Sequence, residues 1–345
     1  MADATRQLPD RLGEELSEKE LCPDELLRGQ EKAFERDIEK LRARRSEFIE
    51  VSCPACDSSD GAFALEKVGF PYCTCNHCGT LYMNPRPSPS VMADYYADSE
   101  NYRYWAKYIF PASEAARREK IHRPWLDRVV DYCDRFSIPK GVLLEVGAGF
   151  GTFSSLAQES GKFERVVAVE PTPEMALACR ERGVRVIEKP IEAISDEIEF
   201  ADIIVAFEVI EHLFEPRSFL GQCSRLMRPG ALLVLSCPNG QGFDISVLGN
   251  ASLAIDPEHV NLFNPHSIST MLQSRRFNML EVSTPGRLDA EFVHTAILEG
   301  KLDISHDPFL KRVLIDEWER LGWPFQRFLA ENGLSSHMWL AACKS

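Results

Sequence analysis

The sequence predicts an α/β protein whose main part is a doubly wound, mostly parallel sheet. Two stretches carry most of this prediction. The run GVLLEVGAGFG at 141–151 has the pattern of a strand, a glycine turn and the start of a helix. The apolar run at 165–169 has the pattern of a second strand, and the acid Glu170 follows it. Beyond it, strand-like and helix-like segments alternate, which implies parallel strands with helices on both faces.

The glycine turn has the features of a ligand-binding loop. Gly147, Gly149 and Gly151 can take positive φ values, and they leave no Cβ in the path of a ligand. The helix that follows offers unpaired backbone N–H groups at its start. The G-x-G-x-G spacing is one residue tighter than the dinucleotide fingerprint. Glu170, at the end of the next strand, could accept hydrogen bonds from both hydroxyls of a ribose.

Apolar runs give the sheet seven expected strands, at 142–144, 165–170, 184–187, 202–206, 232–236, 278–284 and 336–343. Helical patterns follow the first, second, fourth and fifth of them, starting at 152, 175, 218 and 266. The segment 240–268 is glycine-rich, polar and long for a plain connection. The insertion 286–334 separates the last two strands, with helices expected at 308–321 and 324–330.

Two closely spaced cysteine pairs precede this domain. They form the pattern C-x2-C-x18-C-x2-C, whose expected ligands are Cys53, Cys56, Cys75 and Cys78. This spacing is typical of a structural zinc site, because two pairs of thiolates complete a tetrahedron around one ion. The segment is too small to fold on an apolar core, so the metal would supply much of its stability. Cys73 and His77 are alternative ligands.

Two further motifs complete a resemblance to a known family. FEVIEHL at 207–213 follows the fourth strand, and RPGALLVLSCPN at 228–239 contains the fifth. Together with the glycine turn and Glu170, they resemble the class I S-adenosylmethionine (SAM)-dependent methyltransferases over residues 141–284. The resemblance implies a Rossmann-like methyltransferase domain whose last two strands form an antiparallel hairpin. We expect the insertion 286–334 to form part of the substrate cover.

The resemblance also implies which residues contact SAM. Glu170 would hold the ribose, and Pro190 to Glu192 lie where the family contacts the adenine. Phe207 and Glu208, at the end of the fourth strand, would lie beside the methionine end. The expected cofactor-binding residues are Glu145, Gly147, Gly149, Gly151, Glu170, Pro190, Ile191, Glu192, Phe207 and Glu208. The expected cofactors are therefore SAM and a structural Zn²⁺ ion.

The chain divides into four expected segments. These are a helical extension at 1–50, a zinc-binding ribbon at 51–88, a helical lid or linker at 89–140 and the methyltransferase domain at 141–345. The extension should hold one helix over 23–48, which packs on its own chain or serves a homodimer. Aromatic residues between 95 and 110 either attach the ribbon to the main domain or cover the cofactor. Cysteine pairs followed by NPRP and such aromatics look like a subset of the family often associated with sugar or polysaccharide modification.

Two histidines are candidates for the catalytic base. His212 lies in FEVIEHL, and His259 lies in the loop after the fifth strand. A hydroxyl acceptor must lose its proton, and histidine titrates near neutrality. We favour His259, oriented by Asp256, Glu258 or Asn261. The alternative for each histidine is a structural role, as a helix cap for His212 and as a loop anchor for His259.

The composition limits which classes of binding partner and which cellular compartment we expect. The net charge of −14 argues against nucleic acid as the main partner, because phosphate binding needs a cationic surface. No apolar run approaches the length of a membrane span, and the N-terminus lacks a signal-peptide pattern. Most of the 11 cysteines are scattered singly, so we expect a reducing, cytoplasmic location.

The sequence therefore predicts a methyltransferase that transfers a methyl group from SAM to a small-molecule acceptor, preferably a sugar or glycan hydroxyl. One alternative is C-methylation of a nucleotide-linked keto sugar. Another is a non-catalytic protein that binds SAM or a partner.

Overall fold

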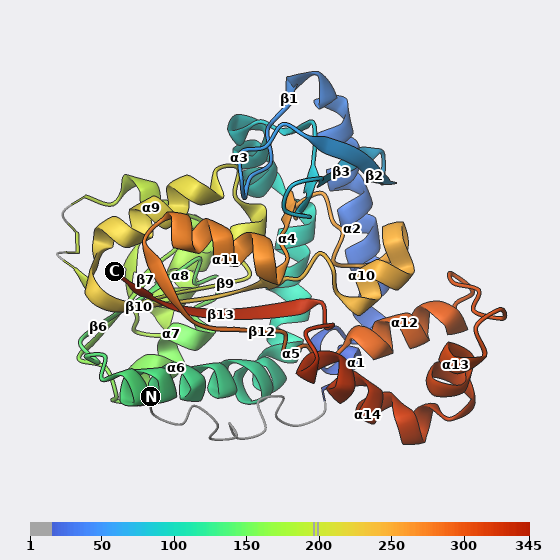
Figure 1. Ribbon diagram of the computed structural model, residues 1–345. Helices are drawn as coiled ribbons and strands as arrows, with labels where there is room; N and C mark the ends of the chain where they lie inside the picture. The colour runs from blue at the N-terminus through green and yellow to red at the C-terminus, as the bar shows by residue number, and fades with distance from the viewer. Residues whose placement is uncertain (1–15, 196, 199) are drawn as a thin grey trace.

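A seven-stranded sheet runs through the centre of the computed structural model, which describes residues 16–195, 197–198 and 200–345 (Figure 1). The strand order is β12-β13-β10-β9-β6-β7-β8. Strand β13 is antiparallel to both of its neighbours, and the strands from β10 to β8 are parallel. The strands are β6 (Val142–Val146), β7 (Arg165–Val169), β8 (Arg185–Ile187), β9 (Ala201–Phe207), β10 (Met227–Pro238), β12 (Phe277–Ser283) and β13 (His337–Lys344). The predicted doubly wound, mostly parallel sheet of seven strands with an antiparallel final hairpin is confirmed.

Helices cover both faces of this sheet, which explains why its strands are apolar throughout. Neighbouring residues of one strand point to opposite faces, so Leu143 and Leu144 of β6 belong to different core clusters. Leu143 packs with α6 (Arg123–Phe136) and α7 (Thr152–Glu159), whereas Leu144 packs with α9 (Pro216–Leu226) and α11 (Pro265–Ser274). Helix α8 (Pro173–Glu181) follows β7.

The cysteine ribbon is joined to the main domain through a shared sheet. Strands β2 (Gly61–Lys67), β3 (Phe70–Cys75) and β4 (Leu81–Met83) are extended by β11 (Asn261–Leu262) in the order β11-β4-β3-β2. A second small sheet pairs β1 (Phe48–Ile49) with β5 (Arg86–Pro87). The expected boundary at residue 88 therefore does not separate two independent sheets.

The N-terminal extension packs on its own chain. Its described part holds α1 (Glu18–Leu21), α2 (Asp24–Ala43) and a 3-10 turn at Arg45–Glu47, and residues 1–15 lie outside the described residues. Ile38 and Leu41 of α2 are buried against the ribbon in one apolar cluster. This part of the stripe is thus covered within the chain.

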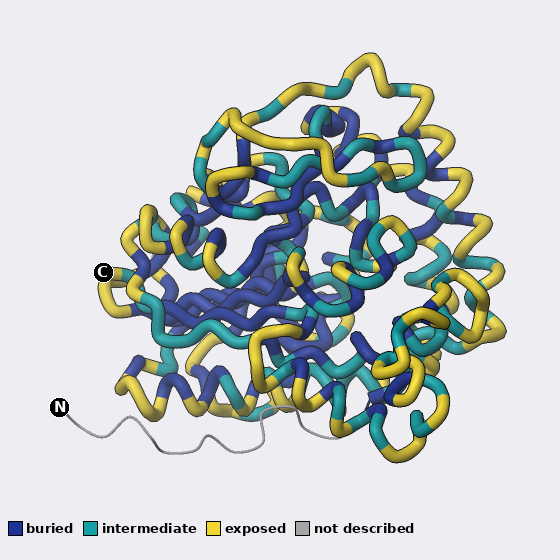
Figure 2. Tube along the Cα trace, turned by 45° about the vertical axis from the view of Figure 1, so that its right-hand side comes forward, coloured by how far each residue is buried: buried dark blue, intermediate teal, exposed yellow. Residues whose placement is uncertain are grey.

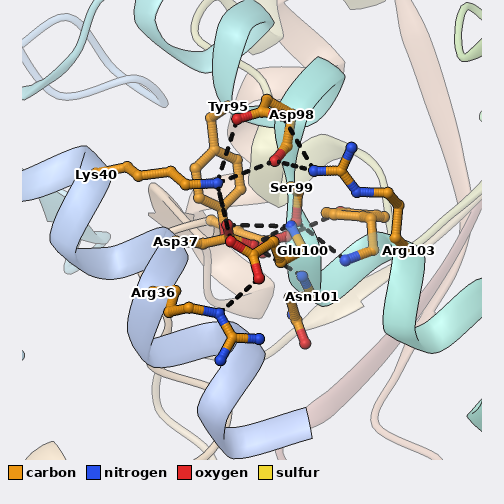
Figure 3. Close-up of polar contacts among 11 residues, drawn as sticks. Arg36, Asp37, Lys40, Tyr95, Asp98, Ser99, Glu100, Asn101 and Arg103 are labelled. Atoms are coloured by element: carbon orange, nitrogen blue, oxygen red, sulfur yellow. Dashed lines mark hydrogen bonds and ion pairs between the residues drawn. The ribbon is translucent and has the colours of Figure 1, made fainter.

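A buried carboxylate on α2 fixes the start of the lid. Asp37 is 1 % exposed, and it accepts hydrogen bonds from Ser99 Oγ (2.7 Å) and from the backbone N–H groups of Glu100 (3.1 Å) and Asn101 (2.8 Å) (Figure 3). These residues lie at the junction between α3 (Pro89–Asp98) and α4 (Glu100–Tyr104). A carboxylate satisfies the free N–H groups of a helix start and complements its positive end.

We expect Asp37→Ala to lower the free energy of unfolding by about 1–3 kcal/mol, because it leaves buried donors without a partner. The loss should appear in urea unfolding. Glu39→Ala, on the exposed side of the same helix, is the control and should stay near wild type. Equal stability of the two variants would show that Asp37 does not hold the lid.

The rest of the lid and the C-terminal insertion are helical. The lid continues from α4 through α5 (Phe110–Arg117) to α6, with π-helical turns at Trp105–Ile109 and Arg118–His122. The insertion contains α12 (Asp289–Leu298), α13 (Pro308–Lys311) and α14 (Trp318–Glu331), which share an apolar cluster with α10 (Phe243–Leu248). Figure 2 shows that buried residues gather in the strands at the centre of the molecule, whereas exposed residues lie on its outer helices and loops. The sequence analysis did not predict α12, and it placed a helix break before Pro324, which lies inside α14.

Candidate functional site

A cavity of about 670 Å³ lies at the carboxyl ends of β6, β7 and β9. In open α/β sheets, ligands bind at this edge. Its walls come from the glycine turn, from the ends of the parallel strands and from the lid. The lid contributes Tyr96, Ala97, Ser99, Tyr102, Arg103, Ala106 and Lys107. The aromatic segment therefore forms one wall of the cavity as well as packing on the ribbon.

Most of the residues predicted to contact SAM line this cavity: Gly147, Gly149, Glu170, Pro190, Ile191, Glu192 and Glu208. Three others, Glu145, Gly151 and Phe207, lie outside its lining. Glu145 is buried and accepts a hydrogen bond from Ser154 Oγ. A Cβ on Gly151 would meet Cys179 Sγ at 2.8 Å, so this glycine serves close packing. Phe207 packs on Trp125 and Trp339.

Glu170 links the glycine turn to the end of β7. Its carboxylate accepts hydrogen bonds from the backbone N–H groups of Gly149 and Thr172, both at 2.9 Å. Burial raises the pKa of Glu170, and these two donors oppose that shift. Each oxygen retains a further lone pair. Glu170 can therefore accept hydrogen bonds from a ligand while it shapes the loop.

The two candidate histidines lie side by side. Their ring centroids are 4.8 Å apart, and His212 lines the cavity. His212 Nδ1 lies 3.1 Å from the Glu258 carbonyl, and His259 Nδ1 lies 2.9 Å from the Ala254 carbonyl. Burial and the neighbouring His259 lower the pKa of His212 to about 3, so this imidazole is neutral at pH 7.

The side chains expected to orient His259 make other contacts. Glu258 accepts hydrogen bonds from Tyr95 (2.6 Å) and Tyr102 (2.8 Å) of the lid. Asp256 accepts one from the Glu258 N–H at 2.8 Å, and Asn261 Nδ2 donates to backbone carbonyls of the FEVIEHL segment. The expected orientation by these three side chains is thus wrong, because a backbone carbonyl holds the ring instead.

The segment that forms the strand-end walls of this cavity is similar to known proteins. Residues 115–282 match a family model described as a methyltransferase domain. These residues are therefore similar to a methyltransferase domain. A ubiquinone biosynthesis O-methyltransferase from Bradyrhizobium is 31 % identical over 31 % of this chain and 44 % of its own length. A probable SAM-dependent methyltransferase from Mycolicibacterium smegmatis is 26 % identical over 40 % and 52 %.

The chain spans about half the length of these two relatives. Among solved structures, a SAM-dependent methyltransferase from Clostridium acetobutylicum is similar over 70 % of this chain and 99 % of its own, with 11 % identity and a TM-score of 0.47. Among the helices in the described ranges, none has the length and apolar character needed to cross a membrane.

The sequence analysis missed one contact at the edge of the seven-stranded sheet. His337 Nε2 lies 3.0 Å from Glu208 Oε1, although no role was expected for His337. The closing strand β13 is antiparallel to β10, and His337 pairs with Pro238 at the carboxyl edge of the parallel strands. The first residue of an antiparallel last strand necessarily lies at this edge. The predicted antiparallel hairpin could therefore have placed His337 near the site.

Four sulfur atoms converge in the cysteine ribbon. Cys53 and Cys78 Sγ lie 3.5 Å apart, and Cys56 and Cys75 Sγ lie 3.6 Å apart. All four lie within 4.8 Å of one another. A zinc–thiolate tetrahedron with bonds of about 2.3 Å has sulfur separations of about 3.8 Å. The four predicted ligands thus form one cluster that fits Zn²⁺, and the alternatives Cys73 and His77 lie outside it.

Proposed function

We propose that this chain is a SAM-dependent methyltransferase that methylates a hydroxyl group of a small-molecule acceptor, with a sugar or glycan hydroxyl as the preferred class. The observation that carries the proposal is the layout of the cavity. Gly149 and Glu170 stand on one wall, and Glu208 and His212 stand at the end of the fourth strand. The match to a methyltransferase domain supports the reaction class. The preference for a sugar rests on the cysteine pairs and on the NPRP motif and aromatic residues that follow them. This pattern resembles a subset of methyltransferases that is often associated with sugar or polysaccharide modification.

In this proposal, one group of residues binds SAM and another group contacts the acceptor. Gly147, Gly149, Glu170 and the segment 190–192 hold SAM, which supplies an electrophilic methyl group. Positioning is then the main task of the protein, together with removal of the acceptor's proton. His212 and His259 stand on the acceptor side. The four-cysteine cluster binds a structural Zn²⁺ ion, which stabilises the ribbon. We also predict a cytoplasmic location.

The test is transfer of a labelled methyl group from SAM to nucleotide sugars and glycans, followed by mass spectrometry for a gain of one methyl. We expect an O-methylated product. Isotope exchange at a sugar carbon would instead indicate C-methylation. Tight SAM binding without turnover on any acceptor would favour the binding-protein alternative.

The same experiment includes Glu170→Ala. Loss of a charge-assisted hydrogen bond, worth about 1.5–3 kcal/mol, should weaken SAM binding at least about tenfold in calorimetry. Glu170→Gln keeps an oxygen acceptor for the Gly149 N–H and separates the loss of charge from the loss of loop shape. Glu181→Ala, exposed at the end of α8, is the control. Unchanged SAM affinity in Glu170→Ala would remove Glu170 from the site.

A further inference from the structure

A buried carboxylate without hydrogen bonds stands next to the two histidines. Glu211 is fully buried, and neither of its carboxylate oxygens has a hydrogen-bond partner among the described residues. Ligand atoms of Glu211, His212 and His259 all lie within 4.8 Å of one another. Buried carboxylates are normally paired, hydrogen-bonded or bound to a metal, because the unpaired charge costs several kcal/mol.

The hydrogen bonds of the histidines leave one nitrogen of each ring as an acceptor. A backbone carbonyl can only accept, so Nδ1 of His212 donates to Glu258 and Nδ1 of His259 donates to Ala254. Nε2 then carries the lone pair in both rings. His212 Nε2 faces Glu211 at 4.0 Å from Oε1. An imidazole whose N–H is bound to a carbonyl is the usual arrangement of a metal-ligating histidine.

The backbone around these three residues is fixed from two sides. Glu211 and His212 lie in the 3-10 turn Ile210–His212 directly after β9. Asn261 Nδ2 binds the carbonyl oxygens of that turn and of Leu213, at 2.7–3.3 Å. Tyr72 of the ribbon donates to the Asp256 carbonyl at 2.7 Å and so holds the loop that carries His259. The three side chains are therefore held in place by a rigid frame, as a binding site requires.

The geometry around Glu211 also favours a cation. Its two oxygens are buried without a hydrogen-bond partner in the described part of the chain, and two imidazole rings stand beside them. A divalent ion would satisfy the carboxylate of Glu211 and both Nε2 atoms. His212 lines the cavity, so the ion's remaining positions could face the acceptor.

We propose that Glu211, His212 and His259 bind one divalent transition-metal ion, which holds and activates the acceptor oxygen. Two imidazoles and a carboxylate suit ions such as Mn²⁺, Fe²⁺ or Zn²⁺ and leave coordination positions open. The site is separate from the four-thiolate cluster, whose softer ligands select Zn²⁺. The role of the ion rests on the proposed function, whereas its binding does not.

The acceptor would coordinate the ion through the hydroxyl that is methylated. A coordinated hydroxyl loses its proton more readily, and this proton passes to water. The oxygen's electron pair forms the new O–CH₃ bond while the S–CH₃ bond breaks, and the pair of that bond stays on sulfur. An acceptor with a second oxygen beside the first, as in a vicinal diol, would chelate the ion and bind more tightly.

The test is a titration with Mn²⁺ of protein that carries one zinc per chain, so that the second site is free of zinc. Electron paramagnetic resonance follows the titration, because the sharp signal of free Mn²⁺ disappears when the ion binds. We expect one Mn²⁺ per chain. His259→Ala and Glu211→Gln should each weaken Mn²⁺ binding by more than about tenfold. Glu211→Gln keeps the size of the side chain, so it decides the question if His259→Ala fails to fold. His266→Ala, an exposed histidine on α11, is the control and should bind Mn²⁺ as wild type does.

Absence of Mn²⁺ binding to the wild type would overturn the proposal, as would unchanged affinity in folded Glu211→Gln. Calorimetry with SAM, performed on the same samples without Mn²⁺, separates this outcome from failure of the proposed function. SAM binding without Mn²⁺ binding removes the metal site alone. Mn²⁺ binding without SAM binding keeps the site and removes its role in methyl transfer.

Discussion

Cys75→Ser is expected to release zinc and to unfold the ribbon. Four thiolates around one ion supply about 10–16 kcal/mol in small zinc domains, and the ribbon has little apolar core of its own. Asn261 and Leu262 would also lose their β4 partners, so the loop that carries His259 should become mobile. The measurements are the zinc content per chain and the melting temperature. Methyl transfer should fall together with both.

Cys73→Ser provides the matched control. Cys73 lies two residues away on the same strand, and it is half-buried but outside the cluster. This variant should retain one zinc per chain. Full zinc occupancy in Cys75→Ser, or equal zinc loss in both variants, would contradict the four-cysteine assignment.

Gly149→Val is expected to abolish SAM binding. Gly149 has a φ of +53°, and a Cβ built on it meets no atom within 4 Å, since it would point into open space at the cavity wall. A branched side chain there would occupy the space proposed for SAM. We expect the affinity to fall at least about a hundredfold, which is about 2.7 kcal/mol, in calorimetry.

Backbone strain must be separated from this steric effect, and Gly161 makes that possible. It has a φ of +63°, and a Cβ added to it would also meet no atom within 4 Å, but it lies outside the cavity lining. Gly161→Val should therefore cost stability to a similar degree and leave SAM affinity unchanged. If both variants lose SAM equally, strain in the fold explains the loss.

Local patterns predicted the sheet well, because each strand is bounded by its own turn and its own apolar run. The strand before the glycine turn was expected at 142–144 and is β6, Val142–Val146. The helix of the N-terminal extension was expected over 23–48 and ends at Ala43. Pro324 misled the prediction, because α14 runs through it and loses only a single backbone hydrogen bond.

The candidate site was harder to predict, because its geometry depends on distant segments. Glu170 and the glycines stand in a local motif. In contrast, His337 reaches Glu208 only through the antiparallel pairing of the last strand. In the sequence, Glu211 resembles any other acid of a polar turn. Only its complete burial beside two imidazoles distinguishes it.

The sharing of one sheet by the ribbon and the His259 loop has a consequence during synthesis. Tyr72 and the Asp256 carbonyl, which form a hydrogen bond, are 184 positions apart in the chain. At about 5–20 residues per second, the ribbon leaves the ribosome about 10–40 s before its last strand exists. The cysteines therefore have time to capture their metal first. The folded ribbon then offers β4 as an edge strand, and the loop that carries His259 pairs with it through β11 once that segment has been synthesised.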